Sequence, residues 1–422
     1  MKRIRYALLI MSILSSFMGG CASRTVDEQA AIVTVTEPLQ MQLTNAEETS
    51  TDSVMIEQTE TAMAELAEGE TNPENREVSL VMVGDVLLHT KVYESGLMED
   101  GSYNYDHMFA HVKEDIEAAD IALVNQEVIL GGRELGLSGY PAFNGAYEVG
   151  DSLVDAGFDV ILHATNHALD KGKKGLLNCI HFWKEEYPDI AVLGIHETEE
   201  ESQEIYVQEI NGIRIAILNY TYGTNGIPLP SGMPYAVEVW NEEQITQDVA
   251  HAQENADFVI VCPHWGTEYV LQETADQRNK AQFLADLGVD LVIGTHPHVV
   301  EPVEWVTGVS GNEMLVYYSL GNFINATSGT GEGKAARMLG AMAKVSIIMD
   351  EEKQEVYISE YGIEPLVTHN VSGRGQITTY KLQDYTEELA TQNEMKYQDA
   401  AFSLSYCEDI CNEVFGELYF TN

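Results

Sequence analysis

The chain has 422 residues, 45% of them apolar, and 68 Asp and Glu residues against 22 Lys and Arg residues give it a formal net charge of −46. That length allows two or three structural units, one of them with a large hydrophobic core. A surface this acidic repels nucleic acids and anionic lipid headgroups, so we expect no nucleic-acid partner and no membrane attachment through surface charge.

Residues 1–21 have the features of a lipoprotein signal peptide. Three basic residues precede an apolar run, and "MGGC" ends at Cys21. The run is too short to span a membrane comfortably, and no other segment is long and apolar enough. "MGGC" resembles a bacterial lipoprotein processing site, so we predict that Cys21 is lipidated and anchors an extracytoplasmic protein at the cell surface. Secretion without a lipid is the alternative.

Residues 22–76 are rich in Glu, Thr, Ala and Gln and show no sustained apolar periodicity. A segment of this composition buries too little apolar surface to offset the entropy of folding. We therefore predict an acidic disordered tether between the anchor and a folded domain.

The composition changes at residue 77, where strand-like apolar runs begin. They alternate with helix-like stretches such as residues 107–119 and 274–288. Continuous apolar strands between helices are typical of α/β proteins whose sheets are covered on both faces. The strand-like runs are "VSLVMVGD", "IALVNQE", "FDVILHATNH", "IAVLGIH", "IRIAILNYTY", "ADFVIVCPHWG", "VDLVIGTHPH" and "MLVYYSLGNF".

Two segments follow the main domain, which we place at residues 77–326. Residues 327–380 contain "AKVSIIMD" and "EVYISEYGIEPLVT", which predict a β-rich extension of that domain. Residues 381–422 predict a C-terminal helical tail of one or two helices.

The cysteines other than Cys21 do not define the fold. Cys179 and Cys262 lie in apolar or helical contexts that indicate buried thiols. Cys407 and Cys411, in "CEDIC", either form a disulfide in an oxidising compartment or share one face of a helix.

Five of the apolar runs end in residue types that bind metals. Ligands of open α/β folds collect beyond the carboxyl ends of strands, so these side chains are expected at one rim. A single histidine after a strand is more often structural, but five such strand ends together indicate a metal site. Pro297 stiffens the turn that brings two of the imidazoles together. The residues are Asp85, Asn125, Glu127, Asn166, His167, His264, His296 and His298.

This mixture of imidazole, carboxylate and amide oxygen suits divalent Mn, Fe or Zn better than Ca. With so many donors we expect two ions that share a bridging carboxylate, an arrangement that activates water for displacement at phosphorus. We treat the remaining histidines as structural, with His89 and His163 as the first alternatives.

The ordered set "VGD", "NQE", "TNHALDKG", "PHWGTEY", "GTHPHVVEP" and "YSLGNF" resembles the bacterial capsule-synthesis CapA family, the poly-γ-glutamate capsule proteins. That family is similar to the calcineurin-like metallophosphoesterases. The resemblance covers residues 78 to about 326 and implies a four-layer α/β/β/α sandwich and a metal-dependent hydrolase. It also implies that His167 acts on the leaving group. The metal ligands that it implies are Asp85, Glu127 as the bridging residue, Asn166, His264, His296 and His298.

The sequence departs from the superfamily pattern at two positions. Leu87 stands where a histidine is expected two residues after the first aspartate, and Glu127 replaces the bridging aspartate. Both departures concern the metal positions, so they leave phosphoesterase activity open.

We expect His167 to contact the substrate and Asn166 to face the metals, because adjacent residues of an extended segment project in different directions. A protonated imidazole above the open coordination position can donate a proton to a leaving oxygen. Asp170 is placed either to orient the His167 ring or to cap a helix.

The resemblance further implies a part in making or exporting poly-γ-glutamate, a polyanion, with membrane-embedded capsule-synthesis proteins as partners. A chain of net charge −46 needs a local positive cleft to bind such a polymer. Two other functions remain open: an extracytoplasmic metal-dependent phosphoester hydrolase, and a non-catalytic module that binds polymer. The substrate-binding candidates are Asn125, Arg133, Lys171, Lys173, Lys174, Lys334 and Arg337, although "DKGKK" also fits a solvated helix start.

Overall fold

The computed structural model describes residues 76–420. The predicted signal peptide, Cys21 and the predicted tether up to residue 75 lie outside the described residues. None of the helices in the described part is long and apolar enough to cross a membrane.

The first of two β-sheets has eight strands, and its central strands β1 to β4 run parallel. Strands β12, β13 and β14 continue it on the other side of β1 as antiparallel neighbours, and β11 pairs with the end of β1. The region predicted as a β-rich extension therefore belongs to the same sheet as β1. In sheet order the strands are β14 (Ile377–Lys381), β13 (Glu355–Asn370), β12 (Leu339–Asp350), β1 (Arg76–Val86), β2 (Ile121–Asn125), β3 (Val160–Leu162) and β4 (Ala191–Leu193), with β11 (Asn322–Ile324) beside β1.

The second sheet has six strands. Its inner strands β6, β7, β8 and β10 are parallel neighbours, and β5 and β9 close its two edges as antiparallel strands. In sheet order they are β5 (Tyr206–Ile210), β6 (Ile213–Thr221), β7 (Phe258–His264), β8 (Leu291–Ile293), β10 (Glu313–Tyr317) and β9 (Val303–Thr307).

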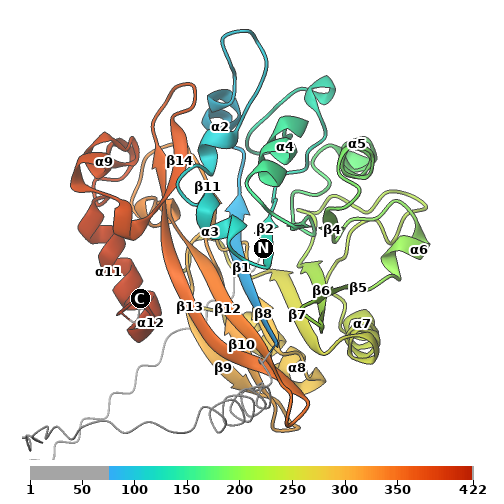
Figure 1. The fold of residues 1–422 in the computed structure, drawn as a ribbon. Helices are drawn as coiled ribbons and strands as arrows, with labels where there is room; N and C mark the ends of the chain where they lie inside the picture. The colour runs from blue at the N-terminus through green and yellow to red at the C-terminus, as the bar shows by residue number, and fades with distance from the viewer. Residues whose placement is uncertain (1–75, 421–422) are drawn as a thin grey trace, which may run out of the picture. The chain divides into compact units, whose positions relative to one another are not determined.

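Helices cover the outer face of each sheet, and the two inner faces pack against each other (Figure 1). This order of layers confirms the predicted four-layer α/β/β/α sandwich. The first sheet carries α2 (Thr90–Ser95), α3 (Lys113–Glu117), α4 (Tyr147–Asp155) and α5 (Gly172–Glu186), the second carries α7 (Glu242–Asn255) and α8 (Ala275–Leu287), and α6 (Glu199–Ser202) precedes β5.

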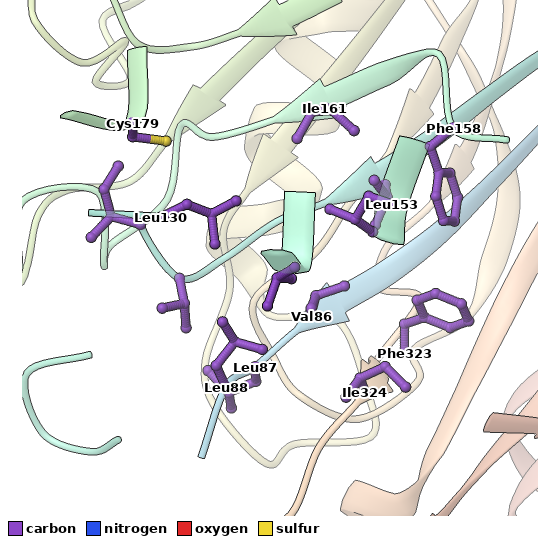
Figure 2. Close-up of a cluster of buried hydrophobic side chains, with 14 of the residues drawn as sticks. Val86, Leu87, Leu88, Leu130, Leu153, Phe158, Ile161, Cys179, Phe323 and Ile324 are labelled. Atoms are coloured by element: carbon purple, nitrogen blue, oxygen red, sulfur yellow. The ribbon is translucent and has the colours of Figure 1, made fainter. Parts of the chain in front are cut away.

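The alternation of side chains along each strand explains the layers. In β1, Leu80 and Met82 point into the core between the sheets, whereas Val81 and Val83 join the outer core beneath α2 to α5. Both sets are apolar because both faces are covered. Phe158 of this outer core meets Phe323 of β11 edge to face (Figure 2).

Two helical predictions differ from the structure. The stretch at residues 107–119 forms a short 3₁₀ helix, Asp106–Met108, and the short helix α3, joined by turns, in place of one continuous helix. The tail forms four short helices where one or two were predicted, beside the β13–β14 side of the first sheet (Figure 1). They are α9 (Glu387–Gln392), α10 (Met395–Gln398), α11 (Leu404–Phe415) and α12 (Glu417–Phe420).

The buried cysteines pack as side chains of the core. Cys407 and Cys411 lie one turn apart on α11, both buried and both free thiols, so they share a helix face. Cys179 and Cys262 are also buried and free. Burial raises the pKa of the Cys179 and Cys407 thiols to about 12, so these groups stay protonated and unreactive.

Candidate metal centre

The carboxyl ends of β1, β2, β3, β7 and β8 meet at one rim, and the predicted ligands lie there. Asp85 reaches this rim because β1 and β11 approach closely: its backbone N–H donates to the Gly321 carbonyl at 3.0 Å. A Cβ atom on Gly84 would lie 1.9 Å from that carbonyl oxygen. Only glycine therefore fits at position 84, directly before the first ligand.

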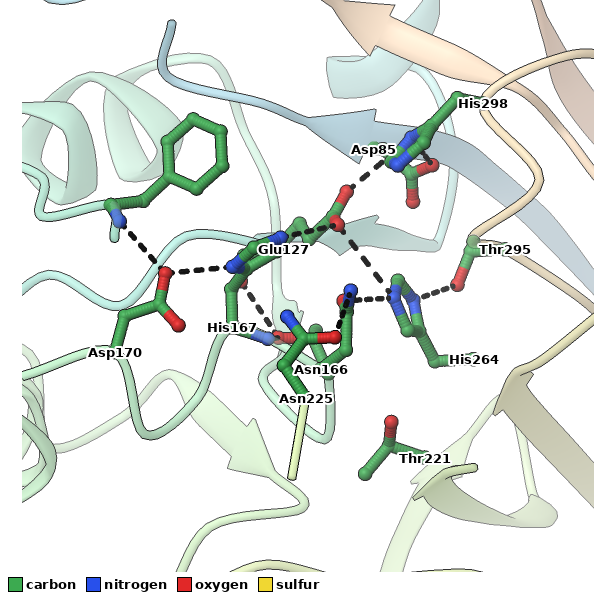
Figure 3. A network of polar contacts seen from close by, with 12 residues as sticks. Asp85, Glu127, Asn166, His167, Asp170, Thr221, Asn225, His264, Thr295 and His298 are labelled. Atoms are coloured by element: carbon green, nitrogen blue, oxygen red, sulfur yellow. Dashed lines mark hydrogen bonds and ion pairs between the residues drawn. The ribbon is translucent and has the colours of Figure 1, made fainter. Parts of the chain in front are cut away.

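Glu127 lies at the middle of the cluster and is fully buried. Its Oε1 atom is 3.8 Å from Nε2 of both His167 and His264, and its Oε2 atom is 3.7 Å from Nδ1 of His298 (Figure 3). Neither oxygen accepts a hydrogen bond. A buried carboxylate that accepts no hydrogen bond is costly, and a bound cation is the usual compensation.

Two groups of donor atoms share Glu127. One consists of Asp85, Glu127 and His298 and the other of Glu127, His264 and His296, and the atoms of each group lie within 4.8 Å of one another. The Oδ1 atom of Asn166 lies 2.9 Å from Nε2 of His264 and adds an amide oxygen to the second group. These residues therefore fit two divalent ions bridged by one carboxylate. All six predicted ligands are brought together.

The turn that carries His296 and His298 has an unusual backbone. His296 has φ 100° and His298 has φ 58°, values that side-chain-bearing residues rarely adopt. The Pro297 carbonyl between them accepts a hydrogen bond from the Tyr269 N–H at 2.7 Å. Strained conformations of this kind persist where the surroundings impose them, and they cluster at functional sites.

Neighbouring polar groups fix the ligands. Asn125 donates from Nδ2 to Asp85 Oδ1 at 2.8 Å, which makes it a supporting residue of the first ligand. Thr295 Oγ1 lies 3.0 Å from Nδ1 of His264 and leaves its Nε2 facing Glu127. Such partners set the ring orientation of metal-binding histidines.

Burial and neighbouring charges set the protonation of the cluster. Burial raises the pKa of Glu127 well above its usual range, and Asp85 adds to this while His298 opposes it. Burial and the neighbouring histidines lower the pKa of His264 and His296. Burial also disfavours the charged form of His298, but Glu127 and the contact with Asp85 outweigh it and raise its pKa to about 9. Neutral His264 and His296 are in the form that binds metal.

His167 lies beside the ligands. Its Nδ1 atom is 2.7 Å from Asp170 Oδ2, which also accepts the Phe143 N–H at 2.7 Å, and its Nε2 atom faces Glu127 (Figure 3). Asp170 therefore orients the ring. It does not cap α5, because the N-cap position is Lys171.

The basis of the His167 prediction was partly wrong. Strand β3 ends at Leu162, and residues 166–170 form a turn, so Asn166 and His167 are not on an extended segment. They nevertheless have different partners, because Asn166 Oδ1 contacts His264 and His167 contacts Asp170 and Glu127.

Leu87 offers no donor, since it is buried in the outer core. Glu268 was not predicted as a site residue, but its exposed carboxylate lies within 4.8 Å of ligand atoms of His296 and His298. It follows β7 by four residues inside "PHWGTEY", and a carboxylate so close after a strand end was the available signal.

The basic candidates are distributed unevenly. Arg133 forms an ion pair with Glu148 at 3.0 Å, and no contact joins it to the ligands. Lys171 Nζ donates to the Ala142 carbonyl at 3.1 Å, next to Asp170 in sequence. Arg337 lies over the Tyr269 ring, at the edge of the ligand cluster. Of the rest, Lys334 donates to the Ser328 carbonyl, and Lys173 and Lys174 are exposed on α5.

His163 and His89, the two other histidines that the sequence offered as alternatives, differ in their surroundings. His163 accepts a hydrogen bond from Trp183 Nε1 at 3.1 Å, and burial lowers its pKa to about 3, which fits a structural role. His89 contacts Phe143 and lies near the cluster, where burial and then the charge on His298 lower its pKa to about 4.

A hollow of about 570 Å³ lies elsewhere, lined by residues of α5, β4 and β5. None of the predicted site residues lines it. The predicted metal ligands therefore gather at the strand ends and not in this hollow.

Solved structures with similarity to the chain include proteins named as a phosphatase, a nucleotidase and a phosphoesterase. The calcineurin-like phosphoesterase YfkN from Bacillus subtilis is 12% identical, with a TM-score of 0.40 over 80% of this chain and 99% of that one. The NAD nucleotidase NadN from Haemophilus influenzae is 12% identical, with a TM-score of 0.44 over 81% of this chain and 64% of that one. Likenesses this distant carry no inference about the present chain.

Two curated proteins are more informative. The capsule biosynthesis protein CapA of Bacillus anthracis is 28% identical over 264 residues, which cover 60% of each chain. The PGA biosynthesis protein CapA of Bacillus subtilis is 32% identical over 173 residues, 41% of this chain and 44% of the relative. The chain thus matches less than two thirds of either relative's length.

The sequence profile of one bacterial family matches residues 79–327, more than half of the chain and the whole segment that carries the ligand cluster. All the motifs that suggested this family lie within that match. The chain therefore belongs to the bacterial capsule synthesis protein family PGA_cap.

Proposed function

We propose that this protein serves the biosynthesis or export of poly-γ-glutamate or a related anionic capsule polymer, through a centre that holds two divalent ions. The observation that carries the proposal is Glu127, a fully buried carboxylate with no hydrogen bond, shared by two groups of donors. The capsule-synthesis relatives support the choice of polymer.

The residues divide into those that hold ions and those that face a substrate. Asp85, Glu127 and His298 would hold one ion, and Glu127 with Asn166, His264 and His296 the other. Such ions, when bound, activate a water molecule and polarise an oxygen that they contact. Mn, Fe and Zn all suit this donor set.

His167 supplies the acid–base function. Asp170 accepts a hydrogen bond from His167 Nδ1 and fixes the ring, so that Nε2 is directed toward the cluster. When the ring is protonated, Nε2 donates a proton to a leaving oxygen or holds an anionic group by a hydrogen bond.

The proposal includes a location. A lipid on Cys21 would anchor the protein outside the cytoplasm, near membrane-embedded capsule-synthesis partners. The basic, apolar and "GGC" order of the N-terminus supports this.

The His167–Asp170 pair favours a second candidate function, a general extracytoplasmic phosphoester hydrolase. A third, non-catalytic polymer binding, follows if the centre binds metal without turnover. One experiment separates the second candidate from the two functions that involve the polymer: metal content by elemental analysis, hydrolysis of an aryl phosphate, and binding of poly-γ-glutamate by the same preparation. Metal with polymer binding supports the proposed function or the third candidate, and aryl phosphate turnover without polymer binding supports the second candidate. Absence of metal in wild-type protein after loading with Mn, Fe or Zn would overturn the metal centre itself.

A further inference from the structure

We infer that Arg337 is a substrate-binding residue that receives a second anionic group, a carboxylate or phosphate, beside the metal centre. This inference rests on the proposed function in one respect, because it takes the ligand cluster as the place where the substrate's first anionic group binds.

Arg337 is held in position by the turn that carries the metal ligands. Its guanidinium lies 3.4 Å from the centroid of the Tyr269 ring, and the Tyr269 N–H donates to the carbonyl of Pro297, between two of the ligands. The Tyr269 ring is also 5.9 Å from the ring of His298. A guanidinium stacked on an aromatic ring is fixed at its face and keeps its edges available for hydrogen bonds.

Asn322 makes a second connection between Arg337 and the cluster. Its Nδ2 atom donates to the Arg337 carbonyl at 2.9 Å, and its Oδ1 atom lies 3.2 Å from Nδ1 of His298. Asn325 also donates to the Arg337 carbonyl, at 3.3 Å. The backbone of Arg337 is thus fixed by a residue that contacts a metal ligand.

The charge of Arg337 is left uncompensated within the described residues. In a chain with 68 acidic residues and 22 basic ones, most described basic side chains form an ion pair, as Arg133 does with Glu148. Among the described residues, the only hydrogen bond of the Arg337 guanidinium is a long one from a terminal nitrogen to Thr327 Oγ1, at 3.4 Å, and its buried Nε has no hydrogen-bond partner. A buried donor without a hydrogen bond favours the binding of an acceptor beside the guanidinium.

Burial lowers the pKa of His89, and the nearby His298, His167, Arg337 and Lys334 lower it further. Arg337 and Lys334 therefore both lie close to His89, beside the ligand cluster. The cluster itself contains the carboxylates of Asp85 and Glu127, so the fixed positive charge lies at its edge. A single small anion needs only the ions, so a further fixed cation fits a ligand with more than one negative group.

The planar fork of Arg337 suits two oxygens of one carboxylate or phosphate, which a lysine binds less specifically. A polymer with a carboxylate on each residue presents such groups repeatedly. One carboxylate would approach the centre while the next reaches Arg337, and this would select polyanions over single anions.

The test compares two probes on the metal-loaded protein: a pentamer of γ-linked glutamate, which tests carboxylates, and inorganic tripolyphosphate, which tests phosphates. Binding is measured by calorimetry for wild type, Arg337→Gln, Arg337→Lys and the control Arg374→Gln. Arg374 is exposed in the turn between β13 and β14 and gives the same change of net charge. Metal content and melting temperature are measured on every sample.

We expect Arg337→Gln to weaken binding of at least one probe by about 10- to 100-fold, as for a lost charge-assisted hydrogen bond. Arg337→Lys should recover part of the loss and Arg374→Gln should bind like wild type. The probe that is affected identifies carboxylate or phosphate as the group received. Equal binding by Arg337→Gln and wild type, or no binding of either probe by wild type, would overturn the inference.

Two results separate this inference from the metal proposal. Loss of metal in Arg337→Gln would make Arg337 structural and also overturn the inference, while the metal proposal stands. Wild-type protein without metal contradicts the proposed function first. If Arg337→Gln does not fold, Arg337→Lys carries the test, with an expected loss of affinity at unchanged metal content.

Discussion

The Nδ1 atom of His298 lies 3.0 Å from Asp85 Oδ2, although 213 positions separate the two residues in the chain. Asp85 ends a strand of the eight-stranded sheet, and His298 follows a strand of the six-stranded sheet. The ligand cluster therefore joins the two sheets at one end of the core between them. Metal that binds there should stabilise the packing of the whole sandwich and not one loop alone.

His296→Ala should lower metal content and melting temperature together. A ligand that binds only the folded protein stabilises it by about 2.7 kcal/mol at 100 times its Kd, and the variant loses part of this. The measurement is elemental analysis with a thermal melt, with and without a chelator. His251→Ala, at an exposed position on α7, is the control. Unchanged metal content and melting temperature in His296→Ala would remove His296 from the ligand set.

Glu127→Gln should have opposite effects on the stability of the protein without metal and with metal bound. Without metal, replacing a buried carboxylate that accepts no hydrogen bond by a neutral amide of the same size should raise stability by about 1–3 kcal/mol. With metal, the variant should be less stable than wild type because the bridging ligand is gone. Urea denaturation in chelator and in excess Mn measures both. A variant less stable than wild type in both conditions would contradict this account of the cluster.

His167→Gln should keep its metals and lose function. Its ring contacts Asp170 and Glu127, while two donor groups form without it. Loss of general acid catalysis typically costs about 10²- to 10⁴-fold in rate. Turnover, or polymer affinity if there is no turnover, is measured beside metal content, and His298→Ala serves as the comparison that loses metal. Metal loss in His167→Gln would instead make His167 a ligand.

The strand ends could be predicted from the sequence where a ligand lies directly at the end of an apolar run. Asp85 and His264 are the clearest cases, since both lie within the last residues of their strands. The apolar strands also predicted sheets covered on both faces, because such strands must be apolar throughout. The four-layer order was implied by the family resemblance.

What could not be predicted depends on contacts between distant segments. The position of Arg337 is set by Tyr269 and Asn322. Neither residue belongs to the same helix or strand as Arg337, so no local pattern connects them. The turn at Asn166 was hidden because β3 ends four residues earlier, at Leu162, with no glycine or proline to mark the end. In the tail, α10 ends at Gln398 and Ser403 caps the start of α11. The local composition does not show this interruption between the two helices.

Glu268→Gln should reduce metal affinity less than loss of a buried ligand does. The side chain is exposed and groups with His296 and His298. We expect a loss of about tenfold, comparable to loss of a supporting residue around a metal site. Competition with a chelator of known affinity measures it, and Glu313→Gln, exposed on β10, is the control. Wild-type affinity in Glu268→Gln would place this carboxylate outside the centre.

Glu301 should make stability depend on pH. It is fully buried, Gln277 Nε2 donates to its Oε2 atom at 2.5 Å, and its Oε1 atom has no partner. Burial raises its pKa from 4.5 to about 8. The folded protein therefore holds a proton that the unfolded chain releases between these values. Stability from this group is present below pH 4.5 and is lost as the pH rises toward 8.

The variant Glu301→Gln removes this titration while keeping the size of the side chain and a hydrogen-bond acceptor for Gln277. Metal-free wild type and variant are unfolded in urea at steps from pH 5 to pH 9, with Glu313→Gln as the exposed control. Over this range the free energy of unfolding of wild type should fall by roughly 1–3 kcal/mol relative to that of Glu301→Gln. One fully released proton would allow a steeper fall, of about 1.4 kcal/mol per pH unit. Because Glu301 lies three residues after His298 and contacts none of the ligands, chelated protein isolates its effect from that of the metals. Parallel curves for wild type and Glu301→Gln would show that Glu301 is ionised in the folded protein throughout, and that burial against Gln277 does not hold its proton.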